Sequence, residues 1–475
     1  MRIRRSLLVV LLLVTLSCNT ITRATIPVEP TLTPPPTATA APTIPVVTET
    51  SPPPTRTVPP ILYVPPDCEN IPPATIPPAT TVAEPTATPL VAGNPQVSTD
   101  VQLRVFEELV STIERVYVYP DFNGKDWPGI VAAYRAKVEA GLDTETFYAE
   151  MNALIAELGD EHSHFESPSQ VAASEVDLSG ALDYVGIGIL VQPLPERGRV
   201  TILSVFPNSS ADLGGLKAHD SILAVDGAPI VQDGQAHPQW VRGPECSAVV
   251  LTVQSPGQEP RDMSFIRYHI TGSQPLGARL VNTTDGSRIG YIFLTTFFDE
   301  TVPVQVEEAL IEFGDLDGLI LDNRMNGGGS SKVVEPILSY FTSGKLGEFV
   351  SREQTRSLAV VADPVHNSQT VPLVVLVGED TVSFGEIFSG ALRDIGRAKI
   401  VGQTTLGNVE TLHGYDFEDG SRVWIAEERF DPLNSDENWE LTGVVPDVEV
   451  IADWDTFTFE TDPVVAAAVE LLRHK

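Results

Sequence analysis

A serine at a predicted strand-to-helix junction has the clearest chemical potential in this sequence. Residues 373–377 form a continuous apolar run, which predicts a buried strand, and a polar turn follows it. Residues 384–395 then carry apolar side chains at helical spacing. Ser383 therefore lies where the helix begins, and Glu386 completes a capping-box pattern. An N-cap hydroxyl is the ordinary role of such a serine, but the free N–H groups and the positive end of the helix dipole also favour a nucleophile there.

A run of three glycines at the end of an earlier predicted strand could complete a site for acyl transfer. Residues 322–330 read Asp-Asn-Arg-Met-Asn-Gly-Gly-Gly-Ser. Glycines allow backbone N–H groups to converge on one oxygen, as an oxyanion hole requires. The D-x-R-x-N-x-G-G pattern, followed by a serine at an elbow, resembles the S41 peptidases, the family of carboxyl-terminal-processing and tricorn-like serine proteases. The resemblance extends from about Val101 to the C-terminus and includes Gly443-Val-Val-Pro-Asp447.

The resemblance implies a role for each part of this constellation. Ser383, in S-F-G-E, matches the family's nucleophile. The N–H groups of Phe384 and Gly328 match its oxyanion donors, with Gly327 as a substitute for Gly328. Processing peptidases take a lysine in a G-K-G context as the base, and the matching residue here is Asn408. An asparagine cannot accept the proton, which excludes a Ser–Lys dyad at this position.

The tricorn-like members of the family suggest a different base. They have D-x-H where the helical domain ends, and Asp160-Glu-His162 has that form. Because histidine titrates near neutrality, His162 could act as base and then as acid without extreme burial. Such members also have a glutamate three residues before the glycine of G-V-x-P-D, which is Glu440 here. The resemblance thus implies a Ser383–His162–Glu440 triad in which the glutamate orients the imidazole.

Several alternatives remain open at this point. His164 and His413 are rival bases, and Glu410, which lies near Asn408 in the sequence, is a rival third member. The chain could also be a catalytically inactive scaffold that binds peptide C-termini, or it could act on a non-peptide ester or amide. The resemblance favours an exported serine endopeptidase that cleaves near the C-termini of unfolded or exported proteins.

Three folded regions are expected to position these residues. Residues 98–177 have helical periodicity, and residues 269–475 alternate strands with helices, which predicts a ClpP/crotonase-like βαβ α/β core. Between them, residues 178–268 resemble a bacterial PDZ domain. There the loop Gly186-Ile187-Gly188 would offer N–H groups to a peptide C-terminal carboxylate while the peptide adds as a strand.

The N-terminal part of the chain predicts export. Residues 1–18 combine arginines, a short apolar run and small residues, as in a signal peptide, and Cys18 ends a candidate lipobox. Residues 19–97 are rich in Pro and Thr and predict a disordered linker. Cys68 lies in that linker and Cys246 in a later domain, so no disulfide framework is implied.

Composition limits the partners. A formal net charge of −34 argues against nucleic acid and anionic lipid surfaces. No zinc-like spacing of Cys and His is present, and the predicted chemistry requires no metal or other cofactor. The expected partners are a protein or peptide substrate and, through an N-terminal lipid anchor, the membrane of the extracytoplasmic bacterial cell envelope.

Overall fold

The computed structural model describes residues 59–68, 94–178, 181–281 and 283–473. The predicted signal peptide, Cys18 and most of the predicted linker lie outside these residues. Within the described ranges, no helix has the length and apolar character needed to cross a membrane.

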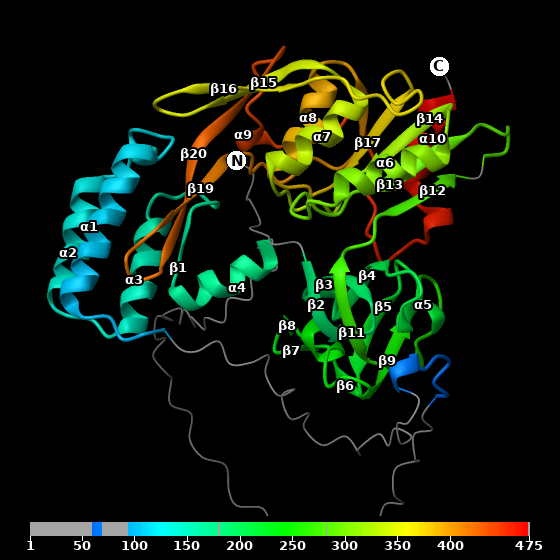
Figure 1. Cartoon of the computed structure of the whole chain (residues 1–475), viewed down its shortest axis with the longest axis horizontal. Coiled ribbons are helices and arrows are strands. Elements are labelled where there is room, and N and C mark those ends of the chain that lie inside the picture. Colours follow the sequence, from blue (N-terminus) through cyan, green and yellow to red (C-terminus); the bar gives the residue numbers. More distant parts are fainter. Residues whose placement is uncertain (1–58, 69–93, 179–180, 282, 474–475) are drawn as a thin grey trace, which may run out of the picture. The chain divides into compact units, whose positions relative to one another are not determined.

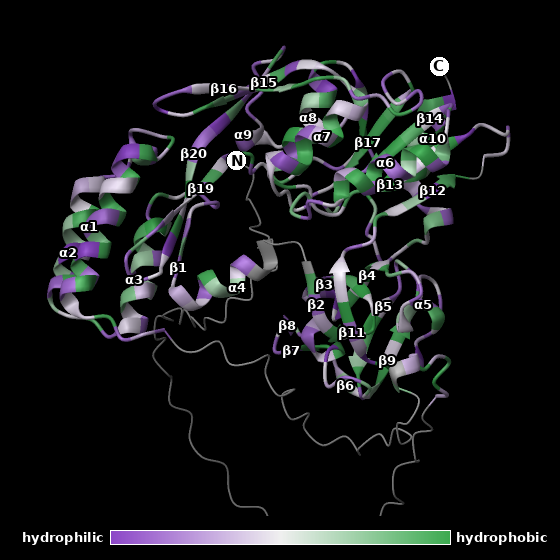
Figure 2. Cartoon of the chain, viewed as in Figure 1, coloured by the Kyte–Doolittle hydropathy of each residue, from purple (hydrophilic) through white to green (hydrophobic). Residues whose placement is uncertain are grey.

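A six-stranded sheet forms the centre of the C-terminal region. Its order is β12-β13-β14-β17-β18-β21, and its strands run parallel except for β12, which pairs antiparallel with β13. Strands β13, β14 and β17 are buried along their whole length, as expected for a parallel sheet covered on both faces. Figure 2 shows their apolar character. The strands are β12 (Gly277–Val281), β13 (Ile289–Phe293), β14 (Gly318–Asp322), β17 (Leu373–Val377), β18 (Ala398–Gly402) and β21 (Val448–Glu449).

Helices cover both faces of this sheet (Figure 1). One core contains side chains of α6, α7 and α8, and the core on the opposite face contains those of α10. This α/β arrangement confirms the predicted fold class, and β17 has the predicted bounds. The helices are α6 (Val302–Phe313), α7 (Ser331–Phe341), α8 (Phe384–Asp394), α9 (Trp439–Thr442) and α10 (Pro463–Arg473).

The predicted helical domain is not packed separately from the C-terminal region. Its buried side chains share one core with Phe417, Val423 and Ile425, which belong to a second, five-stranded sheet or to the turn beside it. This sheet has the order β1-β20-β15-β16, with β19 beside β20. The elements are α1 (Thr99–Val116), α2 (Trp127–Glu139), α3 (Thr144–Ala156), α4 (Pro168–Leu178), β1 (His164–Glu166), β15 (Gly344–Val350), β16 (Thr355–Val360), β19 (Thr411–Asp416) and β20 (Arg422–Pro432).

The region predicted to be a PDZ domain has its own small core and a sheet of order β10-β9-β5-β4-β3. A single 3-10 turn, Pro238–Val241, precedes β9. The elements are β2 (Ala181–Gly186), β3 (Ile189–Leu194), β4 (Arg199–Val205), α5 (Ser210–Leu213), β5 (Ser221–Val225), β6 (Ala228–Pro229), β7 (Val231–Gln232), β8 (Gln235–Ala236), β9 (Ala248–Gln254), β10 (Arg261–Ile266) and β11 (Tyr268–Ser273), which pairs with β2.

A short piece of the predicted linker is held against this sheet, and two expectations are therefore wrong. Cys68 and Cys246 form a disulfide across 178 residues of sequence. The segment 59–68 also bonds to β10, because Ser264 Oγ donates to Pro59 O at 2.9 Å and Ile61 forms a β-bridge with Ser264. Residues 59–68 are thus packed rather than free linker, which brings the two cysteines within 5.3 Å between Cα atoms.

Candidate active site

Ser383 lies at the junction that the sequence predicts, in a backbone conformation unusual for serine. Its φ is 56° and its ψ is −125°, directly before the first residue of α8. A non-glycine residue at positive φ costs energy and is held there by its surroundings. The preceding turn is fixed to the loop that follows β14, where Thr381 Oγ1 donates to Asn323 O at 2.8 Å and Val382 N–H donates to Asn326 O at 2.9 Å.

The Ser383 hydroxyl is not used as a helix cap. Ser383 and Glu386 have the arrangement of a capping box: Ser383 N–H donates to Glu386 Oε2 at 3.1 Å, and the Ser383 side chain lies toward the Glu386 N–H without forming a side-chain cap hydrogen bond. The Ser383 side chain is partly exposed. Its hydroxyl is therefore available for chemistry, which argues against a purely capping role.

The glycine loop lies directly against this elbow. A Cβ added to Gly328 would be 2.7 Å from Ser383 Cβ and 3.2 Å from Phe384 N, so only glycine fits. Phe384 is the first residue of α8, where a backbone N–H has no acceptor within the helix. The structure thus brings Ser383, Phe384 and Gly328 together. However, Gly328 N–H already donates to Asn326 Oδ1 at 2.9 Å, whereas Gly327 faces open space.

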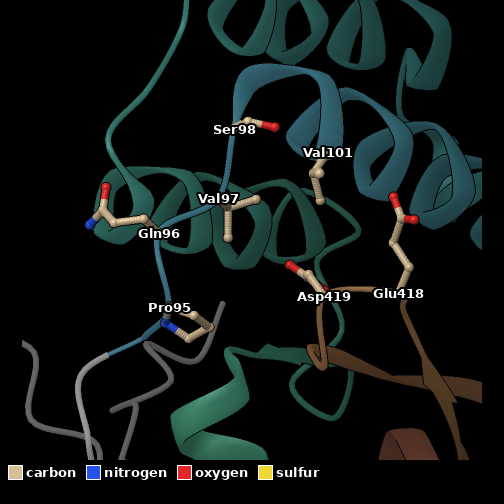
Figure 3. A pocket seen from close by; sticks show the side chains of 7 residues that line it. All are labelled: Pro95, Gln96, Val97, Ser98, Val101, Glu418 and Asp419. Carbon is tan, nitrogen blue, oxygen red and sulfur yellow. The ribbon is translucent and has the colours of Figure 1, made fainter.

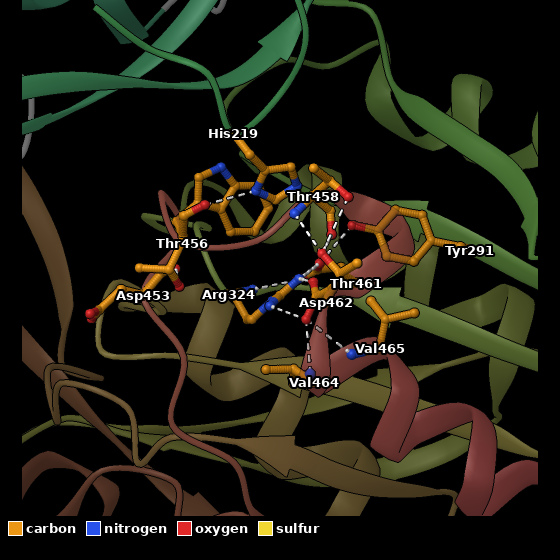
Figure 4. A network of polar contacts seen from close by, with 12 residues as sticks. His219, Tyr291, Arg324, Asp453, Thr456, Thr458, Thr461, Asp462, Val464 and Val465 are labelled. Atoms are coloured by element: carbon orange, nitrogen blue, oxygen red, sulfur yellow. Dashed lines mark hydrogen bonds and ion pairs between the residues drawn. The ribbon is translucent and has the colours of Figure 1, made fainter. Parts of the chain in front are cut away.

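A buried ion network fixes the base of the glycine loop (Figure 4). Arg324 Nη2 lies 2.6 Å from Asp322 Oδ2 and 2.6 Å from Asp462 Oδ2, and Tyr291 Oη donates to Asp322 Oδ2 at 2.6 Å. Asp462 also accepts the N–H of Val464 in the first turn of α10. The loop is therefore linked to a helix on the opposite face of the sheet from α8.

His162 lies in a tight turn that is hydrogen-bonded to β20 through Ser163. Asp160 Oδ1 accepts the N–H groups of His162 (3.1 Å) and Ser163 (2.6 Å), and Ser163 Oγ accepts the N–H of Ala426 (3.0 Å). Burial, reinforced by the charge of His164, lowers the pKa of His162 to about 3, so the ring is neutral at neutral pH. In the described part of the chain, His162 Nδ1 is buried without a hydrogen-bond partner, and no hydrogen bond joins His162 to Ser383 or Glu440.

The rival histidines already have partners. His164 Nδ1 lies 3.0 Å from His162 O, and its Nε2 lies 3.6 Å from Glu166. His413 Nε2 lies 3.5 Å from Glu428, and its pKa is raised, mainly by the hydrogen bond to that carboxylate. The rings of His164 and His413 are both held in structural contacts. Of these three histidines, only His162 has a buried ring nitrogen without a hydrogen-bond partner among the described residues.

Glu440 contacts the backbone of a loop that also carries Asn408 and Glu410. Its Oε2 accepts the N–H groups of Val409 (2.7 Å) and Glu410 (3.2 Å). Burial raises the pKa of Glu440, and the charge of Asp160 raises it further. Glu440 therefore lies near the turn that carries His162, although its observed contacts are those of a loop anchor.

Glu386 is the residue that sequence reasoning missed. It is fully buried, yet it occupies the centre of a set of hydrogen bonds from the elbow and from residues 405–408. Burial raises its pKa to about 7, against the effect of four hydrogen bonds that favour the charged form. Its only signal in the sequence is its place in S-F-G-E, which reads equally well as a capping box.

Buried polar atoms without a partner gather on the loops of this site. Native proteins rarely leave such atoms unpaired, so their concentration is typical of groups reserved for function. Within the described ranges, those on residues 162, 323–326 and 408–411 include His162 Nδ1, Asn323 Oδ1, Asn326 Nδ2, Asn408 Oδ1 and Thr411 Oγ1. The carboxylates of Asp160 and Glu410 interact with the hydroxyls of Tyr117 and Tyr119. None of the described side chains form a cluster suited to a metal ion.

The predicted peptide-binding loop leads into a strand at the end of its sheet. Gly186, Ile187 and Gly188 are buried, Gly188 has a φ of 84°, and Gly188 O accepts the N–H of Phe206 at 2.9 Å. Strand β3 follows the loop and pairs only with β4 in that sheet, among the residues whose structure is described. Its other edge is therefore the one to which an added strand could pair.

A shallow hollow of about 340 Å³ lies away from these residues (Figure 3). It is lined by residues 95–98, Val101, Glu418 and Asp419. None of the candidate catalytic residues contributes to its lining, so the hollow is separate from the candidate active site.

Comparison with known proteins agrees with this geometry. Residues 288–450 match the profile of peptidase family S41, and residues 103–156 match the tricorn protease C1 domain. A carboxyl-terminal-processing protease of a Synechocystis species is 28% identical over 372 residues, which cover 76% of this chain and 84% of that protein. Carboxyl-terminal-processing peptidase 3 of Arabidopsis thaliana is 27% identical over 388 residues, covering 78% and 73%.

Solved structures show the same relationship. The photosystem II D1 C-terminal processing protease has 25% identity and a TM-score of 0.51, with 74% of this chain and 93% of that chain covered. A putative S41 protease from Bacteroides fragilis has 14% identity and a TM-score of 0.56, covering 77% and 97%, and supports the fold alone. The chain is therefore similar to the S41 peptidases over most of its length, which supports a serine-type peptidase.

Proposed function

We propose that the chain is an exported serine endopeptidase that cleaves proteins near their C-termini with a Ser–His–Glu triad. The observation that carries this proposal is the contact of the glycine loop with the strained Ser383 elbow, because it places a free hydroxyl beside backbone N–H donors. The relatives named carboxyl-terminal-processing proteases support cleavage near the C-terminus of the substrate rather than elsewhere.

In this mechanism, Ser383 Oγ attacks the peptide carbonyl carbon while His162 takes the hydroxyl proton. The carbonyl oxygen becomes an oxyanion, which the N–H groups of Phe384 and of Gly328 or Gly327 stabilise. His162 then gives its proton to the leaving amine. Water releases the acyl group from Ser383 by the same steps, with His162 again as base.

Support for His162 as the base comes from its neutral ring and from Asn408. A base must be unprotonated before it acts, and burial keeps His162 neutral. Because a pKa of about 3 also makes the isolated ring a weak base, the Glu440 carboxylate would have to approach the imidazole and raise its pKa before proton transfer. Asn408, in the position of the lysine of processing peptidases, has a buried Oδ1 and no basic group. Glu440 would orient His162, and its closeness to the Asp160 turn supports this role.

The disulfide supports export. Disulfides persist in oxidising compartments outside the cytosol, so the Cys68–Cys246 bond supports an extracytoplasmic location. We further propose that the PDZ-like module binds the substrate tail at the free edge of β3, and that a lipid on Cys18 attaches the enzyme to the membrane.

The test is digestion of an unfolded reporter protein by the full-length chain, with mass spectrometry of the products. We expect cuts within the C-terminal part of the reporter that disappear with Ser383→Ala. Cuts spread evenly along the reporter would contradict the C-terminal preference, and cuts that survive Ser383→Ala would contradict the nucleophile.

A catalytically inactive scaffold that binds peptide C-termini is the second candidate. The observation in its favour is the missing hydrogen bond between His162 and either Ser383 or Glu440 within the described residues. On this alternative, Ser383→Ala leaves binding of a C-terminal peptide unchanged and the wild type cleaves nothing.

A further inference from the structure

Glu386 receives four hydrogen bonds although it has no exposed surface. Its Oε1 accepts from Thr405 Oγ1 at 2.5 Å and from Gly407 N–H at 2.8 Å. Its Oε2 accepts from Asn408 N–H at 2.9 Å and from Ser383 N–H at 3.1 Å. Each carboxylate oxygen thus serves two donors, and the four donors belong to two separate segments of the chain.

These bonds connect the serine elbow to the rest of the site. Asn408 O accepts the same Ser383 N–H at 2.9 Å, so this N–H is shared between Glu386 and the residue in the family's lysine position. Thr405 Oγ1 also accepts the N–H of Val444, in the G-V-V-P-D segment, at 2.7 Å. The Glu386 carboxylate therefore bonds to both the elbow and residues 405–408, and through Thr405 it reaches the G-V-V-P-D segment.

A carboxylate suits this place better than any neutral side chain of the same shape. In its ionised form the Glu386 carboxylate only accepts hydrogen bonds, and all four neighbours can donate to it. A glutamine amide would turn two of its own N–H donors toward N–H groups. Bonds to a charged acceptor are also stronger than those between neutral groups.

We propose that Glu386 is the positioning residue that holds Ser383 in its strained conformation and fixes residues 405–408 beside it. The role rests on the proposed function, because it presumes that Ser383 is the nucleophile. Glu386 acts through Ser383 and does not touch the substrate. Its loss would slow attack by the serine without weakening the binding of a probe.

The test measures the reaction of the full-length chain with a fluorophosphonate probe, as a limiting rate constant and a half-saturating concentration. For Glu386→Gln we expect a rate constant lower by on the order of tenfold or more and a half-saturating concentration within twofold. The matched control is Glu379→Gln, which removes an exposed carboxylate from the same turn and should react as the wild type does. A Glu386→Gln enzyme with the wild-type rate would overturn the proposal.

Two further measurements keep the test decisive. If Glu386→Gln does not fold, the second variant is Thr405→Val, which removes only one of the four donors to Glu386. We expect this variant to react with the probe severalfold more slowly, and an unchanged rate would overturn the proposal. Amide hydrogen exchange of Ser383 and residues 407–408 should accelerate in Glu386→Gln, and unchanged exchange would count against it. Amide hydrogen exchange can be measured on an inactive protein. A folded wild type that does not react with the probe would therefore contradict the proposed function, and the exchange measurement would still test whether Glu386 holds Ser383 and residues 407–408 in place.

Discussion

At the scale of single residues, Ser383 has the backbone conformation and the neighbours expected of a nucleophile, whereas His162 makes no hydrogen bond to it among the described residues. Ser383 has a positive φ, a free hydroxyl and the Phe384 N–H beside it. His162 is neutral and has an unpartnered buried nitrogen. Catalytic hydrogen bonds are often formed only when substrate binds, so this geometry is compatible with the proposed triad if the His162 bonds form on substrate binding.

The acidic residues near His162 predict how stability depends on pH. Burial, with the charge of Glu440, raises the pKa of Glu410 from 4.5 to about 8. Between these values the folded state binds a proton that the unfolded state releases, so the free energy of unfolding should fall as pH rises across this window. Glu410→Gln should reduce this change in the free energy of unfolding by on the order of 2 kcal/mol. Part of the pH dependence should remain, because the raised pKa of Glu386 acts in the same direction.

Denaturant unfolding at pH 5 and pH 8 would check this expectation. Glu161→Gln, which removes an exposed charge from the nearby turn, is the control. The lowered pKa of His162 changes stability in the opposite sense in both proteins, so the comparison with Glu410→Gln decides. A change in stability between pH 5 and pH 8 that is the same in Glu410→Gln and the wild type would contradict the proposed state of Glu410.

At the scale of elements, the glycine loop and α8 depend on each other. Gly328 has a φ of 93°, and an added Cβ would be 3.0 Å from Val382 O as well as close to Ser383. Gly327, its neighbour, has open space around the same position. A side chain is therefore excluded at position 328 but sterically possible at position 327, although both residues are glycine.

This contrast gives a matched pair of substitutions. Gly328→Ala should destabilise the chain by about 1–3 kcal/mol through backbone strain and should abolish reaction at Ser383 by displacing it. Gly327→Ala keeps its N–H and should have little effect on either property. Thermal unfolding and fluorophosphonate labelling of both variants would test this, and equal behaviour of the two would contradict the described packing.

Elements with strong local patterns could be predicted from the sequence, and long-range contacts could not. The strand 373–377 and the helix after Ser383 follow from apolar periodicity, and the glycine–serine contact follows from the family resemblance. The four bonds to Glu386 join residues 19 to 22 positions apart as well as local ones, and no periodicity encodes them. For the same reason, the core that the helices share with β20 could not be predicted.

At the scale of the whole molecule, the disulfide changes how the N-terminal segment relates to the folded part. Cys68 is 2% exposed, and the segment 59–68 lies along β10 at one end of its sheet. The opposite end of the same sheet is β3, which follows the predicted peptide-binding loop. The chain itself thus contacts one edge of the module, and the β3 edge has no paired strand in that sheet among the described residues, as the proposed peptide binding requires.

Removal of this cross-link should weaken the module. Cys68→Ser is expected to lower stability by about 2–4 kcal/mol, because the bond closes a long loop in the unfolded chain. Ser264→Ala, which removes only the hydrogen bond to Pro59, should have a smaller effect. Thermal unfolding with and without reductant would check both, and a wild type whose Cys68 and Cys246 titrate as free thiols would contradict the bond.

The most direct test of the central claim is labelling of the full-length chain by a fluorophosphonate probe, compared across wild type, Ser383→Ala, His162→Ala and His164→Ala. We predict that the wild type and His164→Ala are labelled at similar rates. Labelling should be absent in Ser383→Ala and at least on the order of 10³-fold slower in His162→Ala. Labelling of His162→Ala at the wild-type rate would place the base elsewhere, and no labelling of a folded wild type would contradict a serine peptidase mechanism.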